Sequence, residues 1–251
     1  MAPALDHIII LVPYDVLKNV PASLSSAFIV TPGGQHADGL TENVLILLAD
    51  GCYLELIAFI PGAEAGRPGH WWGAKQGGII DFALTSSDLP SSFPPAYQEP
   101  QAGGRLRPDG KKVEWFVTFP KSEHERGSVP FFCHDRTPRD LRVPISDAAK
   151  TTHHSGATGV AALTVRVPAA VWESVLPVYR DVFGVQPASD GDSVVYETSA
   201  VVGDGKAQIR LVKSEADKVD FGELVLRVEG EEKPAPLEEQ FEGRPFRIRF
   251  V

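Results

Sequence analysis

The chain has 251 residues, of which 43% are hydrophobic and 23% are charged, and this composition is typical of a soluble globular protein with one large or two small domains. The net charge of −9, with scattered basic residues, argues against a nucleic-acid partner, because phosphate binding requires a basic surface. The sequence has neither a run of about 18 apolar residues that could span a membrane nor a signal peptide at its start. We therefore expect a cytoplasmic protein in which Cys52 and Cys133 are buried thiols, since two cysteines are too few for a disulfide scaffold.

The chain opens with a predicted strand over residues 5–13, which a proline ends. Alternation along this strand places Ile8 and Ile10 on the core face and His7 on the opposite face. A short helical stretch is expected within residues 16–28, and a glycine-rich loop over residues 31–36 follows it. This loop ends at His36, and the backbone freedom of its two glycines would let it fold over a ligand.

The next segment, residues 43–59, predicts a β-hairpin around the turn pair Asp50-Gly51. In its second arm, alternation places Tyr53 and Glu55 on the same face. Glu55 interrupts a strand that is otherwise apolar. A carboxylate buried there without a partner would cost several kcal/mol, so we expect Glu55 to reach solvent in a cleft or to have a cationic or metal partner.

A second unit follows a glycine-rich connector that carries Trp71 and Trp72, which we interpret as a lid or an interface. The strands expected in this unit cover residues 79–85, 105–119 (a hairpin) and 130–135.

A third unit begins with a strand over residues 159–168, followed by the clearest helical pattern of the chain over residues 169–184. Four further strands are expected over residues 193–199, 207–213, 223–228 and 245–251. We expect the acidic residues 229–242 to form a solvated loop or a surface helix. The order of elements predicts an α+β protein of curved mixed sheets. Its repeated βαβββ modules would be residues 1–60 and 76–135, paired within residues 1–150, and a more divergent module over residues 155–251.

The segments LDHIIILVP, PGGQH and DGCYLELIAF, followed by PDG, PFFCHD and HHSGATGVAALTV, together resemble the glyoxalase-like members of the vicinal oxygen chelate superfamily. The resemblance covers nearly the whole chain. It implies βαβββ modules paired around a cupped sheet, with a site that usually holds a divalent metal in that family. It also implies that His7 is a metal ligand.

Aligning the first two units places Asp81 at the position of His7 and His134 at the position of Glu55. A shift of one residue would substitute Cys133 for His134 and reverse the facing. In the favoured register, His7, Glu55, Asp81 and His134 would converge as ligands of Zn, Fe, Mn, Co or Ni, and His7, His134 and Glu55 alone would form a facial set of three. Each residue also has a structural interpretation, as a hydrogen-bonded core histidine, a salt-bridged glutamate or a turn aspartate.

We therefore expect a metal-dependent enzyme of the vicinal oxygen chelate type that acts on a small substrate with chelating oxygens. Lyase or isomerase chemistry is favoured over oxygen insertion by a dioxygenase, with Glu55 as ligand or general base and His36 as a second catalytic candidate. The alternative is a metal-free protein that binds or sequesters a small molecule, or a cofactorless enzyme, in the same cup. The predicted substrate-binding residues are Tyr53, Trp72, Phe116 and Phe132. A homodimer formed through the third unit is a further expectation.

Overall fold

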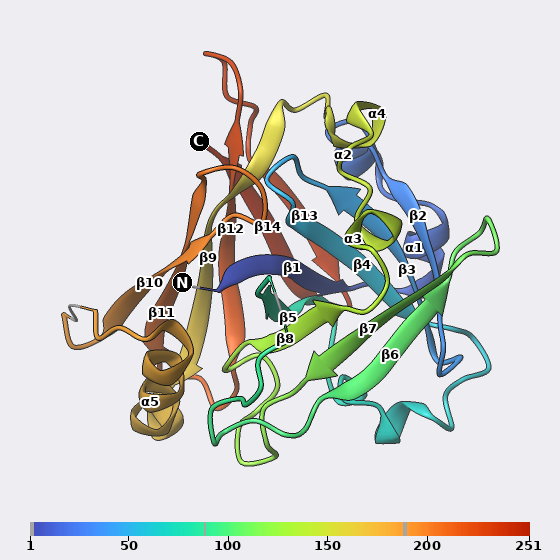
Figure 1. Cartoon of the computed structure of the whole chain (residues 1–251). Helices are drawn as coiled ribbons and strands as arrows, with labels where there is room; N and C mark the ends of the chain where they lie inside the picture. The colour runs from blue at the N-terminus through green and yellow to red at the C-terminus, as the bar shows by residue number, and fades with distance from the viewer. Residues whose placement is uncertain (1–2, 88, 188–189) are drawn as a thin grey trace.

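The computed structural model describes residues 3–87, 89–187 and 190–251, in which the strands join into one continuous curved sheet (Figure 1). The first part of the chain contains, in order, β1 (Ala4–Leu11), α1 (Tyr14–Lys18), α2 (Ala22–Ser25), β2 (Thr31–His36), β3 (Thr41–Leu47), β4 (Tyr53–Phe59), a 3-10 turn (Arg67–Gly69), β5 (Gly78–Thr85), β6 (Gln101–Leu106), β7 (Lys112–Thr118), β8 (Phe131–Asp135), α3 (Arg139–Arg142) and α4 (Ala148–Thr151). The rest contains β9 (Ala157–Pro168), a 3-10 turn (Ala169–Val171), α5 (Trp172–Phe183), β10 (Ser193–Ser199), β11 (Lys206–Ser214), β12 (Asp220–Val228), β13 (Leu237–Phe241) and β14 (Arg244–Phe250).

The strands of the first part close into a barrel. Neighbouring strands follow the order β1-β4-β3-β2-β6-β7-β8-β5, and β5 pairs with β1 to complete the ring. The ring therefore has eight strands among the described residues. A barrel of about this size has an interior just wide enough for packed side chains or for one small ligand. The closure thus places the inward-facing residues of β1 and β4 around a confined space.

The strands of the second part form an open sheet beside the barrel, drawn in yellow to red in Figure 1. Their pairings repeat those around β1: β9 pairs in parallel with β11 and antiparallel with β12, as β1 pairs with β4 and β5. α5 ends at Gly184, whose positive φ of 65° is the left-handed cap expected there. The predicted boundaries of the three modules stay a prediction.

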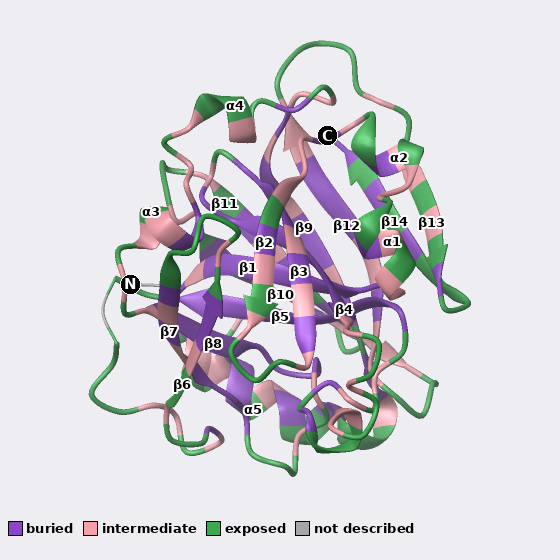
Figure 2. Cartoon of the chain, turned by 90° about the vertical axis from the view of Figure 1, so that its right-hand side faces the viewer, coloured by how far each residue is buried: buried purple, intermediate pink, exposed green. Residues whose placement is uncertain are grey.

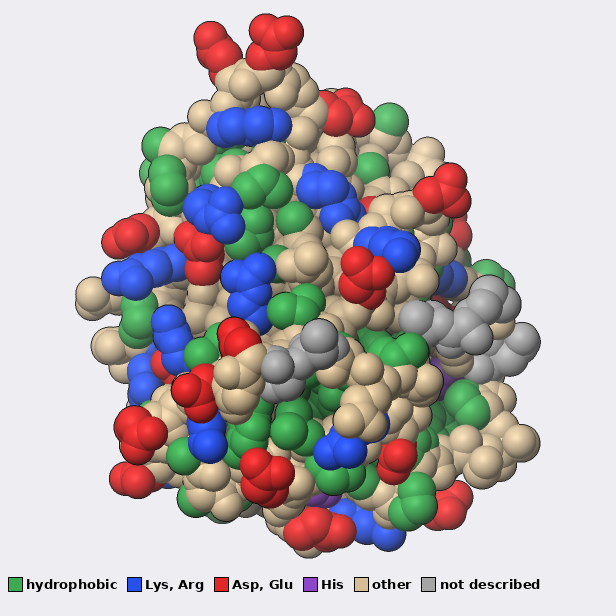
Figure 3. All heavy atoms as spheres, turned by 90° about the vertical axis from the view of Figure 1, so that its left-hand side faces the viewer, with side chains coloured by type: hydrophobic (Ala, Val, Ile, Leu, Met, Phe, Trp, Pro, Cys, Tyr) green, Lys and Arg blue, Asp and Glu red, His purple; other side chains and the backbone are tan. Residues whose placement is uncertain are grey.

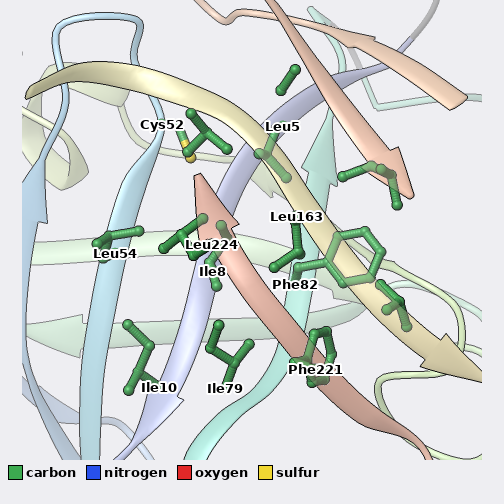
Figure 4. Packing of buried hydrophobic residues seen from close by; sticks show 14 of the residues in the cluster. Leu5, Ile8, Ile10, Cys52, Leu54, Ile79, Phe82, Leu163, Phe221 and Leu224 are labelled. Carbon is green, nitrogen blue, oxygen red and sulfur yellow. The ribbon is translucent and has the colours of Figure 1, made fainter. Parts of the chain in front are cut away.

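The main hydrophobic core lies between the barrel and the open sheet. The even-numbered residues of β1, Ile8 and Ile10, face it from the barrel, and Leu163 of β9 and Leu224 of β12 face it from the open sheet (Figure 4). All four side chains are at most 1% exposed, so this layer holds the two sheets together through the hydrophobic effect. Figure 2 shows how far each described residue is buried: β1 and β5 are buried, and most connections are exposed. Because this core takes one face of β1, the other face is free to line the barrel interior.

The predicted α+β class with a curved mixed sheet is confirmed, but two segments differ from the sequence prediction. Residues 31–36 form strand β2 instead of a loop, because they pair with β3 and with the distant β6. Residues 237–241 form strand β13 instead of a solvated loop or surface helix, because they pair with β14. No helix in the described part of the chain is long and apolar enough to cross a membrane.

The surface carries charges of both signs. On the face shown in Figure 3, lysine and arginine side chains are interspersed with aspartate and glutamate. Exposed ion pairs of the chain include Lys206 with Glu197 and Arg249 with Glu223. Exposed pairs of this kind contribute little to stability, and they leave no single-sign field on this face.

Candidate functional site

The barrel interior contains a cavity of about 120 Å³. It is lined by polar residues from β1, β2, β3, β4 and β6 and by aromatic residues from β7, β8 and the connector before β5. The lining residues are His7, His36, Ala37, Asp38, Thr41, Asn43, Tyr53, Glu55, His70, Trp71, Trp72, Ala102, Gly103, Gly104, Arg105, Trp115, Val117, Phe119, Phe131, Cys133 and Arg142. A concave site with apolar walls and a few convergent polar groups is the usual form of a small-molecule site.

Glu55 lies at the centre of the polar part of this cavity. It is only 4% exposed, and its neighbours across the sheet are Ile9 of β1 and Leu45 of β3. Its carboxylate faces an imidazole on each side, with His7 Nε2 3.5 Å from Oε2 and His36 Nε2 3.6 Å from Oε1. The partners that the buried carboxylate requires are therefore two histidines.

Asn43 holds the carboxylate of Glu55 in place. Its Nδ2 donates a hydrogen bond of 2.5 Å to Glu55 Oε1 and lies 3.4 Å from His36 Nε2. Gly33 makes room for this amide, because a Cβ atom at Gly33 would overlap the Asn43 side chain. One oxygen of the carboxylate is thus fixed by an amide, and the other faces His7.

His36 is held by its second ring nitrogen. Nδ1 lies 2.7 Å from Thr41 Oγ1. Burial lowers the pKa of His36, and the charge of Arg105 acts in the same direction, whereas Glu55 opposes them. A lowered pKa keeps the ring neutral at pH 7, which leaves one nitrogen lone pair for a proton or a metal ion.

His7 is fixed by aromatic contacts. Its ring stacks on Tyr53 with a centroid distance of 4.7 Å and meets the edge of Phe131 at 5.5 Å. Its Nδ1 is buried without a hydrogen-bond partner and lies 3.6 Å from Asp6 Oδ2. His7 therefore sits between two carboxylates, those of Asp6 and Glu55.

A buried ion network supports this wall of the cavity. Asp6 is fully buried and accepts hydrogen bonds from Arg142 at 2.8 Å and from Arg139 at 2.9 Å. Arg142 also pairs with Asp135 and donates to the hydroxyl of Tyr53 at 2.9 Å. Burial raises the pKa of Asp6, but Arg139 and Arg142 outweigh burial and hold the pKa well below its usual value. The network fixes Tyr53, on which His7 stacks.

The structure brings five of the predicted site residues together around the cavity, namely His7, His36, Glu55, Tyr53 and Trp72. Asp81 does not line the cavity. It is completely buried, and its Oδ2 accepts hydrogen bonds from Trp72 Nε1 at 2.9 Å and from Arg126 Nη2 at 2.8 Å. Asp81 thus holds Trp72 against the cavity and has no oxygen facing His7 or Glu55.

Three other predicted residues, Phe116, Phe132 and His134, do not line the cavity. The cause is the facing of two strands: Phe131 and Cys133 face inward on β8, and Trp115 and Val117 face inward on β7, so their neighbours face outward. His134 Nε2 lies 2.8 Å from Ser86 Oγ, outside the cavity. The predicted convergence of four ligands is therefore wrong.

Several cavity residues were missed from the sequence. Asn43 and Arg105 stood at the ends of predicted hairpins, and Arg142 lay in a segment without a predicted element. For Asn43, strand alternation was an available signal. Asn43 pairs with Ile57 of β4, and Glu55 lies two residues before Ile57 on the same face, so the side chains of Asn43 and Glu55 share that face. For Arg105 and Arg142, no pattern within the sequence indicated the fold of the barrel around them.

Two pairs of donor atoms suit a divalent ion. Neighbouring ligand atoms about 2.1 Å from a tetrahedral ion are about 3.4 Å apart, close to the 3.5 Å between His7 and Glu55 and the 3.6 Å between His36 and Glu55. A second group of possible ligands among the described residues consists of Asp6, His7 and Cys133. Their possible ligand atoms all lie within 4.8 Å of one another. Asp6 is already paired with two arginines, and burial raises the pKa of the Cys133 thiol, so this second group is a poor metal site. The ligand atoms of His7, His36 and Glu55 do not all lie within 4.8 Å of one another, so an ion bound by these three residues would have to draw them closer together.

His70 lies at the rim of the cavity and predicts an acid-sensitive contribution to stability. Its Nδ1 accepts a hydrogen bond from the Trp72 N–H, and burial lowers its pKa to about 4. The unfolded chain takes up this proton near pH 6.5, but the folded chain does so only near pH 4, so folding stability should fall as the pH drops across that range, by up to about 3 kcal/mol.

Urea unfolding between pH 7 and 4 measures this effect, with His70→Gln compared to the exposed His154→Asn as control. The loss of unfolding free energy between pH 7 and pH 4 should be smaller in His70→Gln than in the wild type, and the same in His154→Asn as in the wild type. If the unfolding free energy depends equally on pH in the wild type and in both variants, His70 is not the source of the effect.

Comparison with known proteins agrees with the observed fold. A family model described as a glyoxalase-like domain matches residues 5–180. A hypothetical protein from Staphylococcus aureus has a similar structure, with a TM-score of 0.73 and 13% identity over 99% of this chain and 100% of that chain. A mutant of 4-hydroxymandelate synthase from Streptomyces coelicolor has a TM-score of 0.50 and 14% identity over 92% of this chain and 72% of that chain.

At such identities the structural likeness shows the fold alone. The search of curated proteins found no match. The family model, in contrast, covers well over half of the 251 residues. The chain therefore belongs to the glyoxalase-like domain family.

Proposed function

We propose that this protein is an enzyme of the vicinal oxygen chelate type in which Glu55 moves a proton on a small substrate held in the barrel. The observation that carries the proposal is the buried carboxylate of Glu55, which lines the cavity between His7 and His36. A general base must reach the substrate, and the carboxylate of Glu55 lines the cavity. Proton transfer is the step that lyases and isomerases share, so the geometry favours these classes.

Each neighbour of Glu55 has a role in this proposal. Asn43 fixes Oε1 by its hydrogen bond, which leaves Oε2 on the side of His7 to accept a proton. His7 is held by its stack on Tyr53, and it can share the proton that Glu55 receives. The rings of Trp115, Phe119 and Phe131 line the cavity and exclude water from the substrate.

We also propose that a divalent ion, of the group Zn, Fe, Mn, Co or Ni, binds to His7, His36 and Glu55. Two imidazole nitrogens and one carboxylate form a donor set that these ions accept. When bound, the ion would polarise substrate oxygens as a Lewis acid. Glu55 would then need its second oxygen, or a water, for the transfer of the proton.

A second candidate is a cofactorless enzyme or a binding protein that uses the same cavity. The observation in its favour is that Asn43 already occupies Glu55 Oε1. In addition, two residues in the second half of the barrel add no ligand to this set. They are Ala83, which lies opposite His7, and Cys133, which lines the cavity. The acid, the two imidazoles and the aromatic wall would then act without an ion.

Elemental analysis of the purified protein separates the two candidates. Under the first, we expect one divalent ion per chain in the wild type, loss of the ion in His7→Ala, and a melting temperature that falls on chelation and recovers on readdition of the metal. His134→Ala is the matched control, because His134 lies outside the cavity and should leave the metal content unchanged. Absence of bound metal after growth with each of the five ions, with a melting temperature insensitive to chelator, would rule out the metal-dependent form.

A further inference from the structure

Arg105 is a buried cation without a carboxylate partner among the residues that the structure describes. It lies on β6, lines the cavity and is 4% exposed. Its Nη2 donates to the backbone oxygen of Arg142 at 2.9 Å, and its Nε is buried with no hydrogen-bond partner. Arg142, the other arginine of the described chain that is buried to this degree, pairs with Asp6 and Asp135.

An unpaired guanidinium in this position is costly. Burial lowers the pKa of Arg105, and the positive charges of Arg142 and Arg107 lower it further, against the effect of Tyr53 and Glu55. Even so, a guanidinium remains charged at neutral pH. A buried charge normally requires an opposite charge with good geometry, and no carboxylate among the described residues lies within ion-pair distance of Arg105. The missing partner is supplied if the ligand is an anion.

The surroundings of Arg105 define the rest of such a ligand. Its cross-strand neighbours are His36 on β2 and Val113 on β7, so its side chain shares the inner face with His36. Two residues before it, Gly103 makes room for the indole of Trp115, because a Cβ atom there would lie 2.5 Å from the indole nitrogen. The ring of Trp115 lines the same cavity as Arg105 and forms a flat apolar wall.

The size of the cavity limits the ligand further. An apolar cavity of roughly 150 Å³ binds benzene, so the cavity of about 120 Å³ holds a ligand of about one ring. That is the size of a carboxylic acid with one ring.

We infer that the cavity binds a small carboxylate with a single flat ring, and that Arg105 takes the carboxylate while Trp115 and the neighbouring rings contact the ring of the ligand. A guanidinium presents two parallel N–H donors that match a carboxylate, and the Nε–H of Arg105 has no hydrogen-bond partner among the described residues. The inference rests on the proposed function, in that it takes this cavity to be the substrate site. It adds the class of substrate and a specificity-determining residue.

Paired probes of equal shape test the inference. Benzoate and benzamide, and phenylacetate and phenylacetamide, differ in charge but hardly in size, and binding to the full chain is measured by calorimetric titration and by the shift in melting temperature. We expect at least one of the acids to bind about 10-fold or more tightly than its amide, because hydrogen bonds to charged groups are the stronger ones. Equal binding of acid and amide in both pairs, or no binding of either acid, would overturn the inference.

Variants identify the residue responsible. Arg105→Gln should abolish the preference for the acid, and Arg105→Lys, which keeps the charge but not the paired donors, should retain part of it. Arg107→Gln is the matched control, since Arg107 pairs with Asp109 and does not line this cavity. If Arg105→Gln does not fold, as judged by circular dichroism, Arg105→Lys carries the test, and an undiminished preference in the folded variants would refute the role of Arg105.

The outcome is separate from that of the proposed function, because these experiments measure binding without turnover. Glu55→Gln should retain the preference for the acid. A charge preference with an active Glu55→Gln variant would refute the catalytic proposal and support the inference. If Glu55→Gln is inactive and the wild type shows no preference for the acid, the catalytic proposal is supported and the inference is refuted.

Discussion

Glu55→Gln should reduce the turnover of a substrate by about 100- to 10,000-fold while leaving the chain folded, the range by which a positioned general base accelerates a reaction. The amide side chain has the same shape and can still accept the hydrogen bond from Asn43, but it cannot take up a proton. The substrate would be selected from a panel of small ring-bearing acids by its effect on the melting temperature. The rate constant kcat is then compared between the variant and the wild type.

Glu42→Gln is the control for this measurement. Glu42 lies beside Asn43 on β3, but its carboxylate pairs with Lys18 and accepts from Tyr14 outside the cavity. This variant should keep the wild-type kcat. A wild-type kcat in Glu55→Gln would show that another group moves the proton.

Asp6→Asn should lower the free energy of unfolding by about 3 kcal/mol at pH 7, because removal of one member of a buried ion pair leaves the other charge uncompensated. Arg142 is 1% exposed and Arg139 partly buried, and both donate to Asp6. We expect the lower end of the usual range, since Asp135 still pairs with Arg142. Urea unfolding at equilibrium gives the value.

The matched control is Asp109→Asn, which breaks the exposed pair with Arg107 and should leave the urea midpoint nearly unchanged. The dependence on pH gives a second check. The two arginines hold the pKa of Asp6 well below its usual value, so its contribution is complete above the unfolded pKa and is lost as the pH falls through the folded pKa. Equal stability of Asp6→Asn and wild type at pH 7 would contradict the proposed role of the network.

The first module could be predicted closely from its sequence. Strand alternation placed His7 opposite Ile8 and Ile10, and an acid in an apolar strand identified Glu55 as a residue that needs partners. These inferences use only neighbours along one strand, and both residues line the cavity. The alternation of residues along one strand is sufficient to identify a site residue where that strand has one polar residue on an otherwise apolar face.

The second module shows the limit of the same reasoning. Phe131, Phe132, Cys133 and His134 are all compatible with a buried strand, so the sequence cannot fix which alternate pair faces inward, and the choice of His134 over Cys133 was wrong. Likewise, β2 exists as a strand because it pairs with β6, about 70 residues away in the chain. Arg105 could not be identified as a cavity residue for the same reason, since only the closed barrel brings it beside His36.

The pairing of β2 with β6 closes the barrel through two pairs of residues, Gln35 with Leu106 and His36 with Arg105. Gly34 is needed there, because its φ is +133° and a Cβ atom would overlap the backbone oxygen of Leu106. A short seam of this kind is among the first parts of a fold to open through local fluctuations. Opening of this seam would separate His36 from Arg105, and its pairing brings the two side chains together on the inner face of the barrel.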